Sequence, residues 1–285
     1  MRDRRYPVLV SLLGLAVICT AIAGLRWLWP LNAPGDPAPA WAICCQMLGM
    51  TMTADVTQLM AALLRSVLFT FALFGLGSLG VRLWKTQRFV DKLRCATVTR
   101  PPRRLRWIAR QLGLARQVIV IAAPQPLAFC FGFVRPRICL SVGLAEALTD
   151  AELRAVLLHE DHHRRHFDPL RGLIVEVSAA TLVFLPIADE LRDWAMTHAE
   201  LAADRHAIFH AGRASLAGAL HKILTHPLAV RLPVAVGVSG LSATEARIAH
   251  LTGDRRVDLR PSALSLLSSS AILIAACMIV QIPTI

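Results

Sequence analysis

Long blocks of apolar residues interrupt this chain, a pattern typical of membrane proteins. Three of them are long enough to cross a bilayer as helices, at residues 7–29, 56–84 and 263–282. Basic residues precede the first block, as in a signal peptide, but its length and the lack of a small-residue cleavage site favour an uncleaved span. The pattern predicts three transmembrane helices. The composition agrees, with 55% hydrophobic and only 18% charged residues.

Between the second and third predicted spans, apolar and polar residues alternate in shorter segments, as in a folded domain. Three β-prone runs, at residues 117–122, 127–133 and 137–141, are separated by prolines and predict a small sheet. A helix should follow, because Thr149 and Glu152 have the spacing of a capping box. It should end near Phe167, since a residue before proline is disfavoured in the α region. A second, alanine-rich helix is expected over 189–210.

Charge predicts the orientation in the membrane. Between Arg82 and Arg110, ten basic residues accompany a single acid, Asp91, whereas loop 31–55 holds only two charges, both acidic. Basic clusters beside spans stay cytoplasmic, so the N-terminus and the central domain should be cytoplasmic and the C-terminus extracytoplasmic. Nucleic acid is the rival partner for such a cluster. Its position against a span favours a lipid bilayer instead, and no direct nucleic-acid binding is expected.

The candidate chemistry begins with His159, Glu160 and His163, which match the HExxH pattern. On a helix the two imidazoles share a face and can hold one zinc ion, while Glu160 can reach a water on that ion as general base. The rival interpretation is a histidine-rich helix surface, which His162 and His166 also suggest. A random match of this pattern in a chain of this composition is rare, so a catalytic site is favoured.

A catalytic zinc needs a third protein ligand, and Glu200 on the alanine-rich helix is the candidate. Asp204 is four residues further on and shares its face, so it can accept the second N–H of a ligand histidine, with His159 the expected partner. Taken alone, the two acids would equally suit a solvated helix surface. Together with HExxH they predict one zinc ion per chain.

The apolar run 170–188 lies between these ligands. Because His159, His163 and Glu200 must reach one ion, a single membrane crossing between them is excluded. The run is too short to cross twice. It is therefore expected to lie on or dip into the cytoplasmic leaflet, or to be buried domain core.

Several stretches resemble the integral-membrane zinc metallopeptidases of the BlaR/MecR type, with HtpX and Ste24-like peptidases as more distant relatives. They are residues 128–141, 152–160, 164–170 and 200–204, with a weaker echo at 245–251. The resemblance implies a zinc-dependent peptidase, an edge strand above the zinc helix that pairs with extended substrate, and a cytoplasmic repressor or the protease itself as substrate. A membrane protein or a short peptide remains open.

Two departures from the family pattern matter. The sensor members carry a penicillin-binding domain after the last span, and the chain ends at Ile285, so direct β-lactam sensing is not expected. Asp161 also follows the motif glutamate where an apolar or small residue is usual. It adds a negative charge but removes no ligand.

The stabiliser of the oxyanion is left open by the sequence. Tyrosine is not available, because the chain has one and it precedes the first span. The candidates on the second helix are His198, Arg205, His206 and His210, and periodicity does not choose among them.

The expected fold is a mainly α membrane protein, with three transmembrane helices and a cytoplasmic α+β zincin-like domain containing a small sheet. The expected parts are an N-terminal region with the first span (1–33), an outer loop (34–55), a second span (56–84), the protease domain (85–260) and a C-terminal span (261–285). The expected function is zinc-dependent endopeptidase activity on a polypeptide at the cytoplasmic membrane face. The alternatives are a membrane-anchored zinc-binding regulator without turnover and, with weaker support, a transporter.

Overall fold

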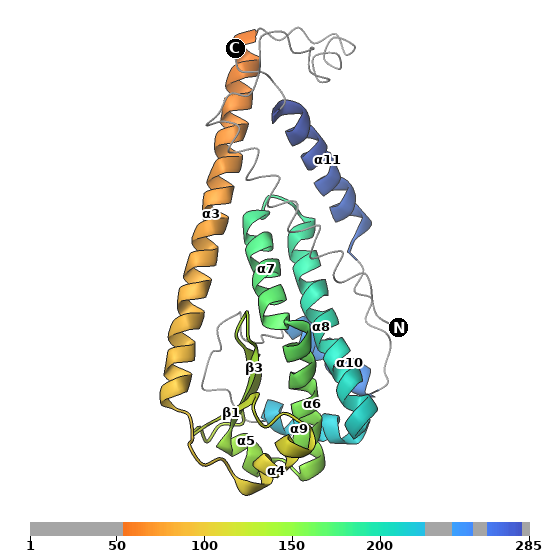
Figure 1. Cartoon of the computed structure of the whole chain (residues 1–285). Coiled ribbons are helices and arrows are strands. Elements are labelled where there is room, and N and C mark those ends of the chain that lie inside the picture. The colour runs from red at the N-terminus through yellow and green to blue at the C-terminus, as the bar shows by residue number, and fades with distance from the viewer. Residues whose placement is uncertain (1–53, 226–240, 253–260, 281–285) are drawn as a thin grey trace. The chain divides into compact units, whose positions relative to one another are not determined.

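The computed structural model describes residues 54–225, 241–252 and 261–280, and within these the chain is mostly helical with one three-stranded sheet (Figure 1). The predicted first span and nearly all of the outer loop lie outside the described residues. The elements, in chain order, are α3 (Ala54–Cys95), α4 (Arg103–Gln111), β1 (Val118–Ile121), β2 (Ala128–Phe131), β3 (Arg137–Ser141), α5 (Val142–Ala147), α6 (Asp150–His166), α7 (Asp168–Thr181), α8 (Ile187–Ala211), α9 (Arg213–Thr225), α10 (Leu241–Thr252) and α11 (Ala263–Val280).

The predicted sheet is confirmed, and each strand falls within its predicted run. The order is β1-β3-β2, with β1 parallel and β2 antiparallel to β3. Successive residues of the central strand β3 face opposite sides. Ile138 and Leu140 belong to one buried cluster and Cys139 to another. The sheet is therefore covered on both faces, which explains why its strands are mostly apolar.

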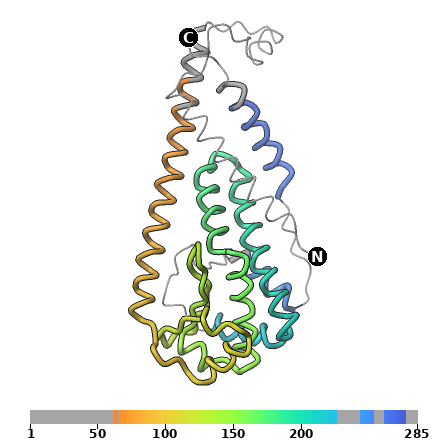
Figure 2. Tube along the Cα trace, viewed as in Figure 1, coloured from red at the N-terminus to blue at the C-terminus, as the bar shows by residue number. Residues whose placement is uncertain are grey.

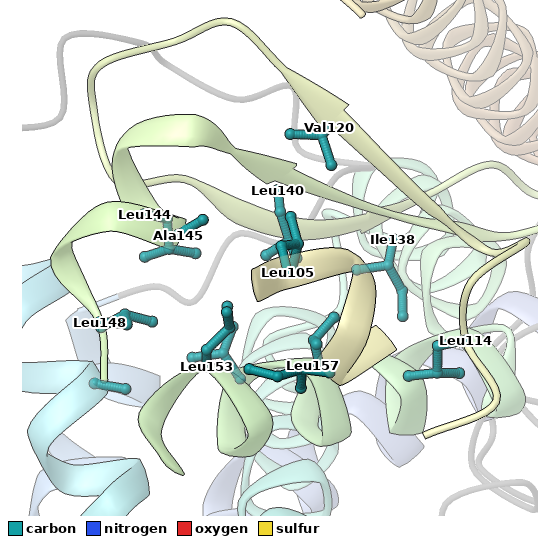
Figure 3. Close-up of a cluster of buried hydrophobic side chains, with 13 residues drawn as sticks. Leu105, Leu114, Val120, Ile138, Leu140, Leu144, Ala145, Leu148, Leu153 and Leu157 are labelled. Carbon is teal, nitrogen blue, oxygen red and sulfur yellow. The ribbon is translucent and has the colours of Figure 1, made fainter. Parts of the chain in front are cut away.

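The larger cluster joins the sheet to the helix that carries the HExxH residues. Figure 3 shows Leu153 and Leu157 of α6 pointing toward Leu105, Ile138 and Leu140, and all five are fully buried. The apolar stripe predicted for this helix is thus its sheet-facing side. This packing fixes α6 beneath the sheet and leaves its other sides to contact α8 and α9.

The opposite face of the sheet is covered by the end of α3. Phe89 and Leu93 of that helix pack on Phe129 of β2, and the rings of Phe89 and Phe129 are 5.7 Å apart. Earlier in the same helix, side chains such as Leu63, Phe74 and Leu76 are more than half exposed. Exposed apolar side chains over several turns are expected where a helix meets lipid.

Only one helix in the described part of the chain is long and apolar enough to cross a membrane. It is the stretch Ala62–Cys95 of α3, which contains an 18-residue window with a mean hydropathy of 1.7. The apolar part of α11 is shorter, Ala263–Ala276. The prediction of three spans is therefore supported for the second span and remains a prediction for the other two.

The chain divides into two compact units. The first consists of residues 1–78, 176–192 and 260–285, and the second of 79–175 and 193–259. Within the first unit Phe71 contacts Phe184, and Glu190 accepts hydrogen bonds from the backbone N–H of Ser262 at 2.8 Å and from the Ser265 hydroxyl at 2.6 Å. The hydrogen bonds of Glu190 hold the start of α11 to the start of α8, and the ring contact joins α3 to the turn before α8.

The apolar run 170–188 is not one helix. Helix α7 ends at Thr181, the chain turns, and α8 begins at Ile187. The two helices lie side by side as an antiparallel hairpin (Figure 2). The chain leaves the second unit at Glu176 and returns to it at Asp193. Such a path lets residues before and after the run meet at one site, as a shared metal ion requires.

Candidate active site

The two histidines of the HExxH pattern stand on α6, whose start is fixed by its own residues. Thr149 Oγ1 accepts from the N–H of Glu152, and the Glu152 carboxylate accepts from the N–H of Thr149 at 2.7 Å. The predicted capping box is thus confirmed. Lys222 Nζ of α9 donates to the same carboxylate at 2.7 Å. Because the helix begins at a fixed residue, the direction of each later side chain is also fixed.

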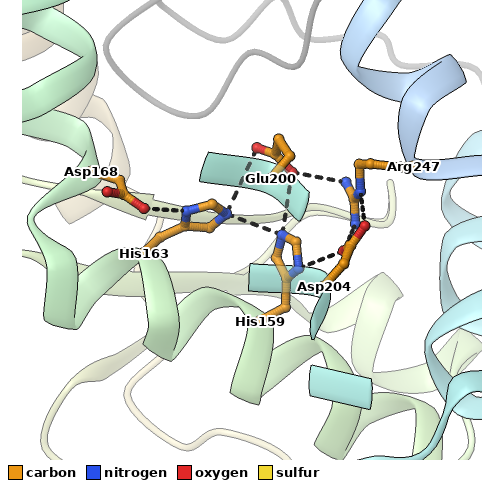
Figure 4. A network of polar contacts seen from close by, with 6 residues as sticks. All are labelled: His159, His163, Asp168, Glu200, Asp204 and Arg247. Carbon is orange, nitrogen blue, oxygen red and sulfur yellow. Dashed lines mark hydrogen bonds and ion pairs between the residues drawn. The ribbon is translucent and has the colours of Figure 1, made fainter. Parts of the chain in front are cut away.

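His159 and His163 lie one turn apart, are both buried, and point their Nε2 atoms at the same space, 3.1 Å from each other. Glu200 of α8 closes this space. Its Oε2 is 3.4 Å from His159 Nε2, and its Oε1 is 3.7 Å from His163 Nε2 (Figure 4). One ligand atom from each residue lies within 4.8 Å of those of the other two. The structure therefore brings together the three predicted ligands.

The second nitrogen of each imidazole meets a carboxylate. His159 Nδ1 is 2.9 Å from Asp204 Oδ1, close enough for an ion pair although its angle falls outside a directed hydrogen bond. His163 Nδ1 is 2.9 Å from Asp168 Oδ2. Carboxylates in these positions hold imidazoles so that Nε2 faces inward. The contact with Asp204 was predicted from the sequence, whereas the contact with Asp168 was not.

Asp168 reaches His163 because of the turn between α6 and α7. Helix α6 ends at His166, and Phe167 adopts the left-handed conformation with φ of 55°. The predicted end of the helix is therefore confirmed. The single left-handed residue reverses the chain, so that the first residue of α7 lies beside the last turn of α6.

Arg247 of α10 was not among the predicted site residues. Its Nε and Nη2 donate to the two oxygens of Asp204, both at 2.9 Å, and its Nη1 is 3.1 Å from Glu200 Oε2 (Figure 4). One guanidinium thus balances two buried carboxylates, for which its planar donors are suited. The only signal in the sequence was the weak motif at 245–251, which includes this residue.

Comparison with known proteins agrees with this geometry. The sequence matches the family described as BlaR1 peptidase M56 over residues 47–251, which is most of the chain. The chain belongs to the BlaR1 peptidase M56 family. The matched region includes each residue of the site drawn in Figure 4.

Two curated relatives match a shorter part of the chain. A protease HtpX homolog from Sulfurovum sp. is 31% identical over 81 residues, which are 27% of this chain and 29% of that protein. A protease HtpX homolog from Methanothermobacter thermautotrophicus is 37% identical over 79 residues, 27% of this chain and 30% of that protein. The chain thus matches less than a third of the length of these relatives.

Glu160, the predicted base of this M56 chain, is buried beside the ligand cluster. Burial raises its pKa, His159 and His163 lower it, and Glu200 raises it further. Burial is the largest cause of the raised pKa of the thiols Cys130 and Cys139, and the charge of Glu160 raises it further. The Glu160 carboxylate is thus close enough to β2 and β3 to act on one thiol in each strand.

The charges of the site affect how a metal would bind. Burial lowers the pKa of His163, but the hydrogen bond to Asp168 and the charge of Glu200 outweigh it and raise the pKa to about 9. This imidazole therefore carries a proton at neutral pH unless a metal ion binds to it. A metal ion must displace that proton, so metal affinity should rise with pH up to about 9.

The donor set fits a metal ion well. Two imidazole nitrogens and one carboxylate oxygen, all buried, match the ligands of catalytic zinc. The carboxylates of Asp204 and Asp168 lie behind the two rings, in the positions that such sites use to orient their imidazoles. The extra charge of Asp161 does not disturb this set, because Arg164 and Arg165 pair with it at 2.8 and 2.5 Å.

The structure does not distinguish among the four candidates for the oxyanion stabiliser. His198 stacks on Trp194, Arg205 is exposed, and the rings of His206 and His210 contact each other, 4.6 Å apart. None of these contacts directs a side chain to the ligand cluster. The identity of the oxyanion stabiliser therefore remains open among these four residues.

Proposed function

We propose that the protein is a zinc-dependent endopeptidase, anchored in the membrane, that hydrolyses polypeptides at the cytoplasmic face. The observation that carries this proposal is the meeting of His159, His163 and Glu200 beside the buried Glu160. A zinc-binding regulator without turnover would need the three ligands but no base. The placement of Glu160 therefore favours an enzyme.

The residues divide the chemistry among them. A zinc ion held by the three ligands would polarise the substrate carbonyl and lower the pKa of a bound water toward about 7. Glu160 accepts the proton of the attacking water and delivers it to the leaving amine. Asp204 and Asp168 fix the two imidazoles, and Arg247 fixes Glu200 and Asp204.

Strand β2 is the surface that suits an extended substrate. It lies at one edge of the sheet, packs against α6 and pairs with β3 alone among the described strands. A peptide added to its open edge would gain main-chain hydrogen bonds with little demand on sequence. The resemblance suggests a cytoplasmic transcriptional repressor, or a second copy of the protease, as the polypeptide that binds there.

Hydrolysis by the purified protein tests the proposal. The protein in detergent should cleave an unfolded reporter protein, lose this activity when a chelator removes zinc, and regain it when zinc is added back. The measurement is the appearance of new peptide termini by mass spectrometry. Zinc binding with no cleavage of any unfolded protein or of the chain itself would favour the non-catalytic regulator.

The carboxylate and guanidinium behind the ligands should control metal affinity. Asp204→Ala is expected to weaken zinc binding by about 10- to 100-fold without loss of the fold, because His159 loses its outer partner. Arg247→Ala should have a similar effect, since it leaves two buried carboxylates without their counter-ion. Competition with a chromophoric chelator measures both.

Two conservative variants serve as controls for that experiment. Arg247→Lys should recover part of the affinity, because it restores the charge but not the paired donors. Arg192→Lys, on the same helix as Glu200 but paired with Asp189, should bind zinc normally. Unchanged affinity in both Asp204→Ala and Arg247→Ala would contradict the positioning role given to this pair.

The path of the chain predicts that both sides of the α7–α8 hairpin face the cytoplasm. Single cysteines at Val134, which is 82% exposed, and at Arg213, exposed at the start of α9, should both resist an impermeant thiol reagent in intact cells. Both should react once the cells are permeabilised. A cysteine at Asp36, in the predicted outer loop, should react in intact cells.

This experiment uses a background in which the native cysteines are replaced by alanine. Reaction at Arg213 but not at Val134 in intact cells would mean that the run 170–188 crosses the membrane. A ligand about 2 Å from zinc cannot lie across a hydrocarbon core of roughly 30 Å. That result would therefore exclude Glu200 as a ligand.

A further inference from the structure

A pocket of about 730 Å³ lies where the end of α3 meets the sheet. Side chains of α3 between Leu83 and Arg94 line one side of it. Ile119 of β1, Phe131 of β2 and the turn that joins β2 to β3 line the other. These residues belong to the sheet face that α3 covers, whereas α6 packs on the opposite face. The pocket is therefore separate from the ligand cluster, and its volume is typical of a site for a small molecule.

The charged side chains of this pocket are all positive. Arg94, Arg135 and Arg137 line it, and none of the acidic side chains in the described part of the chain does. Arg137 of β3 lies directly across from Phe131 of β2, so it stands beside that ring. Arg94 has Asp91 as a distant partner, at 3.7 Å. Arg135 and Arg137 form no ion pair with any other described residue. The pocket therefore favours an anion.

The walls of the pocket between these charges are apolar and aromatic. Leu83, Trp84 and Val90 contribute from α3, and Phe131 and Phe133 from the sheet. Leu83 and Trp84 are 40% and 55% exposed, so the apolar lining continues onto the outer side of the helix. An inorganic anion would gain little from such walls. A ligand with an anionic head and an apolar tail would use both the charges and the walls.

The pocket lies at the end of the candidate membrane span. The apolar stretch of α3 begins at Ala62. About 20 residues of helix cross the hydrocarbon core, so the helix leaves that core near Arg82, its first basic residue after residue 65. Trp84 follows, with the Arg88 guanidinium 4.2 Å from its ring centroid. Tryptophan and basic residues are typical of the membrane surface. The pocket is therefore at the depth of the lipid headgroups.

One polar group in the pocket has no partner. Thr86 lines the pocket and is only 4% exposed, and its hydroxyl makes no hydrogen bond with any described residue. By contrast, the hydroxyls of Thr70 and Thr97 donate to backbone oxygens four residues earlier, at 2.8 and 2.9 Å. A buried hydroxyl without a partner costs free energy. An acceptor oxygen on a ligand in the pocket would supply that partner.

We propose that this pocket binds the headgroup of an anionic phospholipid from the cytoplasmic leaflet, in the orientation proposed above. Arg135 and Arg137 bind the phosphate, and the acyl chains follow the exposed apolar side of α3 into the bilayer. The inference needs α3 to lie in the membrane. It does not need the ligand cluster to be occupied or active.

A bound lipid would hold the sheet at the membrane surface. Phe131 and Arg137 stand on β2 and β3, and Arg135 lies in the turn between these strands. A headgroup held by these residues would tie the end of β2 to the bilayer. Since β2 is the proposed edge for an extended substrate, the lipid would favour polypeptides that run close to the membrane.

Lipid binding by the purified chain tests the inference. The full chain in a non-ionic detergent is titrated with phosphatidylglycerol, and native mass spectrometry measures the lipid that is retained. We expect a single saturable site for phosphatidylglycerol, and much weaker binding of phosphatidylcholine and of inorganic phosphate. In an Arg135→Gln, Arg137→Gln variant the affinity for phosphatidylglycerol should fall by about 30-fold, since each arginine beside an anionic headgroup contributes a factor of about five.

Two further variants serve as controls. Arg103→Gln, Arg116→Gln removes the same charge from two exposed residues outside the pocket, so it should bind phosphatidylglycerol like the wild type. Arg135→Lys, Arg137→Lys should keep most of the affinity, because it preserves the charge. Circular dichroism and zinc content, measured on every variant, should match those of the wild type.

Three results would overturn the lipid site. An equal loss of affinity in both glutamine variants would mean that lipid is attracted to the basic surface as a whole. Phosphatidylcholine that binds as tightly as phosphatidylglycerol would exclude recognition of the headgroup charge, and inorganic phosphate that does so would mean a site for a soluble anion. The measurement involves no substrate and no added zinc. Its failure would therefore leave the proposed peptidase intact, and a failure to detect hydrolysis would leave the lipid site intact.

Discussion

Replacing Glu160 with glutamine is expected to abolish peptide hydrolysis while leaving the fold and the bound zinc in place. Glutamine has nearly the same shape as glutamate, so the space beside the ligand cluster stays filled. Its amide cannot accept a proton from water. A general base contributes about 10²- to 10⁴-fold to a rate, so the turnover number should fall by at least that factor.

The measurement compares the initial rate of reporter cleavage with the zinc content of the same sample. Glu146→Gln is the matched control, because this substitution makes the same chemical change at an exposed residue of α5. The control should retain full activity. Wild-type rates in the Glu160→Gln protein would show that another group serves as the base, and the role proposed for this residue would have to be given up.

The largest expected change in metal content comes from the double variant His159→Ala, His163→Ala. It removes two of three ligands, and the remaining Glu200 carboxylate cannot hold zinc tightly alone. The tightly bound zinc should fall from about one ion per chain to none, as measured by elemental analysis after dialysis. Removal of one imidazole alone should already lose most of it.

The same helix offers the control for that change. His162→Ala, His166→Ala removes two histidines at the same spacing from another face of α6, so it should keep the tightly bound ion. Full zinc content in the His159→Ala, His163→Ala protein, or its loss only in the His162→Ala, His166→Ala protein, would contradict the assignment of the ligands.

Much of the site could be predicted because the sequence features that indicate it lie within single helices and strands. The capping box at Thr149 fixes the start of α6, and a spacing of four residues fixes the shared face of His159 and His163. The strands were predictable because apolar runs ended at prolines. Asp204 was predictable from Glu200, since residues four apart on a helix share a face.

Contacts between distant segments had no such signal. Arg247 is 43 residues from Asp204, and nothing in the spacing of either residue indicates their pairing. Asp168 was read only as the residue that ends a helix, because its contact with His163 depends on the left-handed turn at Phe167. The break of the run 170–188 into two helices was also missed, although Pro186 stands directly before the start of α8 and proline is common at the first turn of a helix.

The turn at Phe167 also limits how this chain can change in evolution. A single residue separates the helix of both imidazoles from the helix that begins with Asp168. One inserted residue would turn that carboxylate by roughly 100° about the axis of α7 and move it away from His163. Surface loops ordinarily accept insertions. Among chains that keep His163 and Asp168, this junction should instead keep a constant length, even where the sequence around it diverges.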